Sequence, residues 1–138
     1  MKNTHTLLTI FFAIFFISAG MVVKTTVDQE PWVVPGKYKK MENPTDPSDK
    51  EGLMIAKRLW SKHCKSCHGV KGLGDGSKAA ELDTPSGDFS TKAFQAQSDG
   101  ELYYKTVEGR GDMPAYDKKI PEEEDRWLLV NFMRTFGE

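Results

Sequence analysis

The pentapeptide Cys64-Lys65-Ser66-Cys67-His68 limits what this chain can fold into, because it contains the only two cysteines of the sequence. On a helical turn, two thiols three positions apart lie on the same face. Two cysteines at this spacing, followed directly by a histidine, are typical of covalent haem attachment, in which each thiol adds to one vinyl group of the porphyrin. His68 can then offer a ring nitrogen to the iron. The motif predicts one covalently bound haem c, held by Cys64 and Cys67, with His68 as the proximal iron ligand.

Three other uses of these residues account for the pattern less well. A structural zinc site needs four ligands, and His63, Cys64, Cys67 and His68 are two pairs of sequence neighbours that rarely converge on one tetrahedral ion. A thioredoxin-like redox pair requires a βαβ context, which the sequence does not suggest. A simple disulfide would leave His68 without a role.

The N-terminus has the pattern of a targeting segment. Lys2 precedes an apolar run from Leu7 to Ile17, and the small residues Ser18-Ala19-Gly20 follow. This arrangement is typical of a cleaved signal peptide. The alternative is an uncleaved membrane anchor over residues 7–23, whose length of roughly 25 Å is slightly short of a ~30 Å hydrocarbon core. Under either interpretation residues 1–23 send the rest of the chain out of the cytoplasm, into the periplasm or onto the outer face of the membrane.

The next segment, residues 24–47, is predicted to be a linker because its prolines and Gly36 interrupt any helical or strand period. Trp32 and Tyr38 are unusual in a flexible tether, and they either pack on the following domain or a partner or lie isolated on the surface. The net charge of −1 provides no basic surface for nucleic acid.

From residue 48 onward the pattern is helical. Ser48 and Glu51 have the spacing of a capping box, which predicts a first helix from Ser48 that leads into Cys64. Ser98 and Glu101 repeat the pattern and predict a second helix through Glu108. A third helix is expected from Pro121 to Gly137, with acidic residues in its first turn. A shorter helix is expected over residues 90–96.

The predicted inward residues of the third helix are Leu129, Phe132, Met133 and Phe136, at helical spacing. No convincing run of alternating apolar residues indicates a strand. The fold class is therefore all-α, with three main helices, and residues 48–138 form the expected domain.

Residues 51–138 resemble a class I monohaem cytochrome c domain. The resemblance rests on the haem motif, on the flanking helices, and on Ala56 and Trp60, which that family packs against residues such as Leu129 and Phe132 of its last helix. It implies a small cytochrome c fold around one haem. The linker more weakly resembles the segment before the haem domain in monohaem cytochrome c subunits of alternative complex III.

The family's sixth iron ligand is a methionine in a loop before the last helix, and Met113 in the stretch from Gly109 to Tyr116 resembles it. Met113 is also favoured because it lies on a Gly/Pro loop remote from His68. By contrast, Met54 lies on the proximal helix, and Met133 fits the core stripe of the last helix. Met113 is therefore the predicted distal iron ligand.

With His68 and Met113 both bound, the iron keeps no open position for catalysis, so the chain is expected to be a one-electron carrier of a respiratory chain and not an enzyme. Two alternatives stay open, a fixed relay subunit of a membrane respiratory complex and a haem sensor or peroxidase-like protein with an open sixth site. The expected partners are redox proteins of a membrane respiratory chain, acting as donor and acceptor. Lysines around the motif could steer an acidic partner: Lys62, Lys65, Lys71 and Lys78.

Other residues are candidates for contacts around the haem. The Pro85 carbonyl is a candidate acceptor for the free nitrogen of His68, while Arg110 and Tyr116 are candidates for binding a propionate. Candidate wall residues, each equally acceptable as ordinary core, are Leu73, Leu82, Phe89, Tyr103 and Val107.

Overall fold

The structure is a computed structural model that describes residues 30–137. Within this range it contains helices and no strand, apart from an isolated bridge between Arg110 and Met113. The all-α class predicted from the sequence is confirmed. The predicted signal peptide or anchor (residues 1–23) and the first part of the predicted linker lie outside the described residues.

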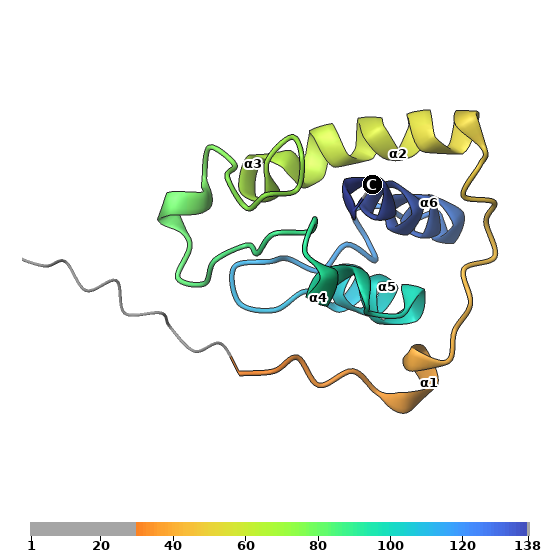
Figure 1. The fold of residues 1–138 in the computed structure, drawn as a ribbon, viewed down its shortest axis with the longest axis horizontal. Helices are drawn as coiled ribbons and strands as arrows, with labels where there is room; N and C mark the ends of the chain where they lie inside the picture. Colours follow the sequence, from red (N-terminus) through yellow and green to blue (C-terminus); the bar gives the residue numbers. More distant parts are fainter. Residues whose placement is uncertain (1–29, 138) are drawn as a thin grey trace, which may run out of the picture.

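Three longer helices form the body of the fold: α2 (Lys50–His63), α5 (Asp99–Glu108) and α6 (Glu123–Arg134). Helix α6 contacts both α2 and α5, and Figure 1 places it between them. The remaining elements are short: α1 (Gly36–Lys39), α3 (Lys65–His68), η1 (Ala79–Glu81), α4 (Lys92–Gln95) and η2 (Thr135–Gly137).

Helix α2 begins one residue later than the capping-box prediction. Its N-cap is Asp49, whose carboxylate accepts a hydrogen bond from Glu51 N at 2.9 Å, and not Ser48. The Ser48 hydroxyl and amide instead donate to the Asp46 carboxylate, at 2.7 and 2.8 Å. Asp46 thus engages the Ser48 side chain in a local turn, which leaves Asp49 to cap the helix.

Helix α5 agrees with its prediction. Ser98 is the N-cap, and both hydrogen bonds of the capping box to Glu101 are present. The helix ends at Glu108 and is followed by Gly109 at a positive φ of 65°. The shorter helix expected over residues 90–96 is α4.

Helix α6 begins at Glu123, two residues after the predicted start at Pro121. The Arg126 guanidinium accounts for the later start of the helix, because its Nη1 donates to the carbonyls of Ile120 at 2.6 Å and Pro121 at 2.9 Å. This contact holds the preceding residues in a loop against the first turn. At the other end, the turn η2 continues from Thr135 to Gly137.

The core between α2 and α6 contains the pairs expected from the sequence. Ala56 and Leu129 are fully buried, and the Trp60 and Phe132 rings lie 5.8 Å apart between centroids. Met133 is buried, while Phe132 and Phe136 are half-buried beside it. A second cluster joins α5 to α6 through stacked Tyr103 and Trp127 rings, 4.0 Å apart.

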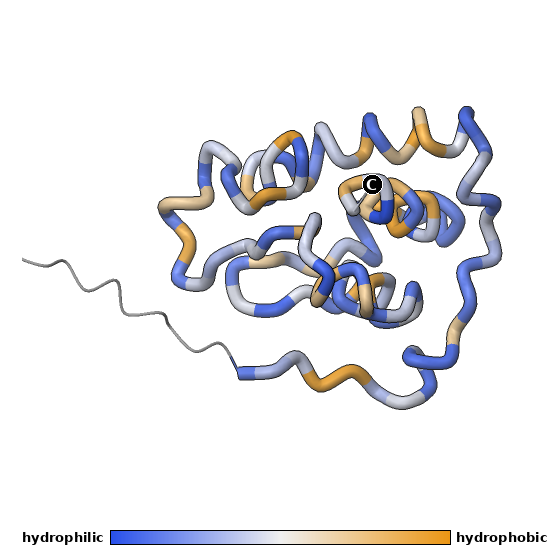
Figure 2. The backbone as a smooth tube through the Cα atoms, in the orientation of Figure 1, coloured by the Kyte–Doolittle hydropathy of each residue, from blue (hydrophilic) through white to orange (hydrophobic). Residues whose placement is uncertain are grey.

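The described part of the predicted linker, residues 30–47, packs on the helices, and we call it the strap. Figure 1 shows it running along α5 through α1 before it turns up to α2, and Figure 2 shows an apolar stretch in it just before α1. Within that stretch Val34 is buried. Asn43 Nδ2 donates to the Trp127 carbonyl at 3.2 Å and to Asn131 Oδ1 at 2.8 Å. The strap is therefore tied to both α5 and α6.

Candidate functional site

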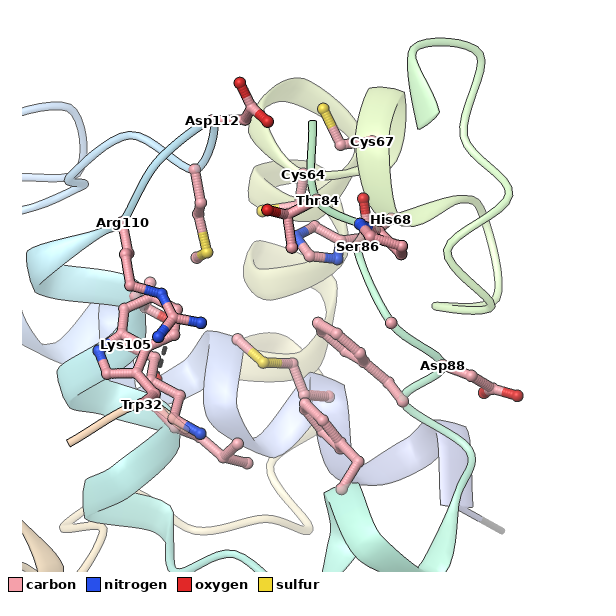
Figure 3. Close-up of a pocket in the computed structure, with 18 of the residues that line it drawn as sticks. Trp32, Cys64, Cys67, His68, Thr84, Ser86, Asp88, Lys105, Arg110 and Asp112 are labelled. Atoms are coloured by element: carbon pink, nitrogen blue, oxygen red, sulfur yellow. Dashed lines mark hydrogen bonds between the residues drawn. The ribbon is translucent and has the colours of Figure 1, made fainter. Parts of the chain in front are cut away.

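A cavity of about 460 Å³ lies where the end of α2, α5, α6 and the loops between them meet. Figure 3 shows Cys64, Cys67 and His68 on one side of it and Trp32, Lys105 and Arg110 on another. Its lining is mostly apolar and includes Trp60, Leu82, Phe89, Phe94, Met113 and Met133. Residues widely separated in the sequence thus surround one space.

The cysteines are presented by consecutive turns of backbone. Cys64 is the C-cap of α2, and its carbonyl accepts hydrogen bonds from Cys67 N at 3.1 Å and His68 N at 3.0 Å. This turn directs both thiols and the imidazole to the cavity. The two thiols are free of any disulfide, and burial raises the pKa of Cys64 to about 12, with a smaller contribution from Cys67.

The His68 ring is held between aromatic side chains. Its centroid lies 4.7 Å from that of Phe89 and 5.8 Å from that of Trp60, whose Nε1 donates to the Gly69 carbonyl at 3.0 Å. Burial lowers the pKa of His68, so the neutral imidazole, the form that binds a metal, is favoured.

The candidate hydrogen bond from His68 to the Pro85 carbonyl is absent. The Nδ1 atom of His68 is buried without a partner among residues 30–137, although Pro85 lines the cavity. The backbone of Ser86, one residue further along, is the group that partly opposes the lowering of the His68 pKa. The backbone group near His68 therefore belongs to Ser86, the neighbour of the candidate Pro85, and the Pro85 contact itself is not formed.

The glycine-rich loop after the motif folds back on it. Gly74 N donates to the His68 carbonyl at 2.9 Å, and Gly76 N donates to the Cys67 carbonyl at 3.2 Å. A Cβ at Gly76 would lie 2.3 Å from the Ser66 carbonyl oxygen, so a side chain has no room there. These contacts brace the turn that carries the two cysteines and His68.

Met113 lies on the predicted loop and lines the same cavity as His68. Arg110 and Met113 exchange backbone hydrogen bonds, at 2.8 and 3.0 Å, which close the loop at its base. A Cβ at Gly109 would lie 2.4 Å from the Met113 carbonyl oxygen, and its φ of 65° also favours glycine. The backbone that presents Met113 is therefore tightly constrained.

Several other predicted residues can now be placed. Leu82, Phe89, Arg110 and Tyr116 line the cavity, whereas Leu73 is 44% exposed and Tyr103 and Val107 belong to the second core cluster. The Tyr116 hydroxyl donates to the His63 carbonyl at 2.7 Å, and burial raises the pKa of Tyr116 to about 12. Tyr116 thus braces the end of α2 with its hydroxyl.

The cavity is also lined by residues that had no such role in the sequence analysis, and three of them matter for its chemistry. Met133 belongs to the buried stripe of α6, as predicted, and also lines the cavity. Lys105 lines it from α5, and Trp32 lines it from the strap. The sequence did contain a signal for Trp32, because an aromatic residue is unusual in a proline-rich segment. Nothing in the sequence indicated that Lys105 would line the cavity.

The donor set and the space fit a covalently attached haem. Two thiols and an imidazole line one wall, a thioether from a distant loop lines the same space, and aromatic rings surround it. A volume of about 460 Å³ is within the range of pockets that hold cofactors. The zinc alternative finds no support, since residues 30–137 contain no group of three or more His, Cys, Asp or Glu placed to hold an ion.

Residues 52–133, more than half of the chain, match the family described as "Cytochrome C oxidase, cbb3-type, subunit III". The chain belongs to this family of cytochrome c domains. The cytochrome domain accordingly carries a covalently bound c-type haem with its iron and serves haem-based electron transfer. Domains of this class are generally exported.

Two solved structures are similar to the cytochrome domain. A chain of the "Kuenenia stuttgartiensis reducing HAO-like protein complex Kustc0457/Kustc0458" is 24% identical, with a TM-score of 0.58. That match covers 74% of this chain and 53% of the other, so this chain spans about half of its neighbour's length. The "KustC0563 c-type cytochrome" is 28% identical, with a TM-score of 0.52, over 60% of this chain and 98% of that one. No curated protein gave a significant match.

None of the helices between residues 30 and 137 combines the length and apolar character that a membrane crossing requires.

Proposed function

We propose that this protein is a one-electron carrier whose haem is attached through Cys64 and Cys67 and ligated by His68 and Met113. One observation carries the proposal: the His68 imidazole on α3 and the Met113 thioether on the loop before α6 line the same cavity. The bound haem would supply exchange of one electron between the ferrous and ferric states of iron.

The residues of the chain would set the conditions for this exchange. Trp60 and Phe89 hold the His68 ring, and the paired backbone of Arg110 and Met113 holds the thioether loop. The mostly apolar lining would limit the contact of the metal ligands with water, and together with methionine ligation this would favour a raised reduction potential. If His68 and Met113 both held the iron, a catalytic role at the metal would be disfavoured.

We further propose that the domain works outside the cytoplasm, in the periplasm or at the outer face of the membrane, with residues 1–23 as signal peptide or anchor. Its electron donor and acceptor would be redox proteins of a membrane respiratory chain. Lys62, Lys65, Lys71 and Lys78 are all exposed around the haem motif, which supports an acidic docking face on the partner.

A second candidate is a fixed relay within a respiratory complex. It is favoured by the family description, which names a subunit of an oxidase. The two candidates differ in how the protein behaves after gentle solubilisation of its native membranes: a relay stays with an oxidase through size-exclusion chromatography, whereas a free carrier elutes alone.

The optical spectrum of the ferric, full-length protein tests the axial ligands. The proposal expects a low-spin spectrum with the weak far-red absorption band of an iron–thioether bond. A high-spin ferric spectrum with rapid binding of added ligands would reject it in favour of an open sixth site. Mass spectrometry of the same sample would detect the covalent haem and whether the N-terminal segment has been removed.

A further inference from the structure

Trp32 reaches the haem cavity from a segment that precedes the family match. The match begins at residue 52, yet Trp32 lines the cavity together with Lys105 and Arg110. The site as a whole is therefore larger than the family domain.

The strap holds Trp32 in place through the packing of the residues that follow it in sequence. Two residues later, Val34 is only 6% exposed, and the Tyr38 ring lies 4.6 Å from that of Tyr104 on α5. A Cβ at Gly100 would lie 1.9 Å from the Tyr38 carbonyl oxygen, so the strap backbone approaches α5 as closely as a glycine allows. The position of Trp32 follows from these contacts.

Two cations gather on Trp32 at this corner of the cavity. The Arg110 guanidinium carbon lies 4.4 Å from the Trp32 ring centroid, and Lys105 Nζ lies 5.7 Å from it. Arg110 Nη1 also donates to the Glu30 carbonyl at 3.0 Å, and Lys105 Nζ donates to Gln97 Oε1. The strap thus orients Arg110, while Gln97, which lies outside the strap, orients Lys105.

Neither cation has a carboxylate within ion-pair distance among residues 30–137. Two acidic residues line the cavity, but Asp112 accepts from Asp83 N at 2.8 Å and Asp88 accepts from Ser90. Figure 3 shows both carboxylates directed away from Lys105 and Arg110. Glu101 acts on Lys105 only from beyond ion-pair distance. Half-buried positive groups without an ion pair are costly, and they favour an anionic ligand in this corner.

We propose that the strap completes the haem site and that Trp32, Lys105 and Arg110 form a corner that binds the propionate carboxylates of the haem. This inference rests on the haem attachment proposed above. Because reduction adds a negative charge, cations at this corner would also stabilise the ferrous form. A segment outside the family domain would in this way set part of the reduction potential.

The test uses the full-length holoprotein and four variants that change the corner: Lys105→Gln, Arg110→Gln, Arg110→Lys and Trp32→Ala. The control is Lys118→Gln, an equal loss of charge at an exposed residue that does not line the cavity. Optical titration gives the ferrous-to-ferric ratio at one fixed ambient potential, and resonance Raman spectroscopy reports the propionate bending vibrations.

Each change to glutamine is expected to lower the ferrous-to-ferric ratio about threefold and to shift the propionate vibrations, as expected for loss of one charge near the haem. Trp32→Ala is expected to change both in the same direction, whereas Arg110→Lys and Lys118→Gln leave the ratio near its original value. If the glutamine variants shift the ratio no more than Lys118→Gln, or leave the propionate vibrations unchanged, the proposal is wrong.

The test separates this inference from the proposed function. Failure of the proposed function appears in the unmodified protein as a ferric spectrum without the iron–thioether band. Failure of the strap proposal leaves that spectrum intact and appears only in the variants.

Discussion

The double variant Cys64→Ala, Cys67→Ala removes both thiols that attach the haem and leaves its cavity to be filled by protein or solvent. At about 24 cal/mol per Å³, an empty cavity of about 460 Å³ corresponds to roughly 11 kcal/mol of lost stability. This is an upper value, because solvent and side-chain collapse reduce the cost. It is still comparable with the ~5–15 kcal/mol that holds a typical domain together. We therefore expect the haem-free variant to be largely unfolded.

The assay is thermal unfolding of the haem-free double variant, followed by circular dichroism in the far and near ultraviolet. Ser66→Ala is the matched control, because it changes an exposed side chain within the same motif and keeps both thiols. The control should unfold cooperatively, and the double variant should give no cooperative transition and no near-ultraviolet signal. A cooperative, native-like transition in the haem-free variant would refute the reasoning.

Three further predictions concern the polypeptide itself. Trp60→Phe removes the donor to the buried Gly69 carbonyl, and we expect it to lower the free energy of unfolding, measured by chemical denaturation, by about 2 kcal/mol. Trp127→Phe loses no hydrogen bond among residues 30–137 and should lower it by about 1 kcal/mol. Gly100→Ala should destabilise the protein by about 1–3 kcal/mol, although alanine has the better helix propensity, because the new Cβ would clash with the strap. Gly36→Ala is the control: its Cβ would contact no other atom, so the stability should not change. Desolvation lowers the pKa of His63 below 6.5, so this residue contributes stability above pH 6.5 that is lost as the pH falls. His63→Gln should therefore make the free energy of unfolding less dependent on pH in this range.

Each of these has a clear contrary result. Equal losses for the two tryptophan variants would remove the role given to the Gly69 hydrogen bond. A Gly100→Ala protein as stable as the original would mean that the strap can move away from α5 to admit the new methyl group at little cost in free energy. A stability profile near pH 6 that is the same with and without His63 would assign the pH dependence to other groups.

Local sequence chemistry predicted the parts of the fold that short-range hydrogen bonds determine. The capping box at Ser98 and the glycine after Glu108 set both ends of α5 as expected. The two shifted helix starts have equally local causes that the pattern did not reveal. Asp46 competes for Ser48, and Arg126 bonds the carbonyls of Ile120 and Pro121.

The parts of the site that escaped prediction depend on contacts between distant residues. Trp32 meets Arg110 across nearly eighty positions of sequence, and no periodic pattern reports such a meeting. Met133 was assigned to the core from helical spacing, and it is buried, but only the packing of α6 against the loops makes it a cavity residue as well. Residue spacing identifies which face of a helix is buried, whereas the cavity depends on which loops and helices pack against that face.

The presence of two methionines in one cavity defines the decisive measurement. Met113→Leu and Met133→Leu each replace a thioether by an apolar side chain of similar volume, so packing changes little while the sulfur is removed. In the ferric spectrum of the full-length holoprotein, Met113→Leu should abolish the iron–thioether band and Met133→Leu should retain it. Retention of the band in Met113→Leu, or its loss in Met133→Leu, would contradict the assignment of Met113 as the distal ligand.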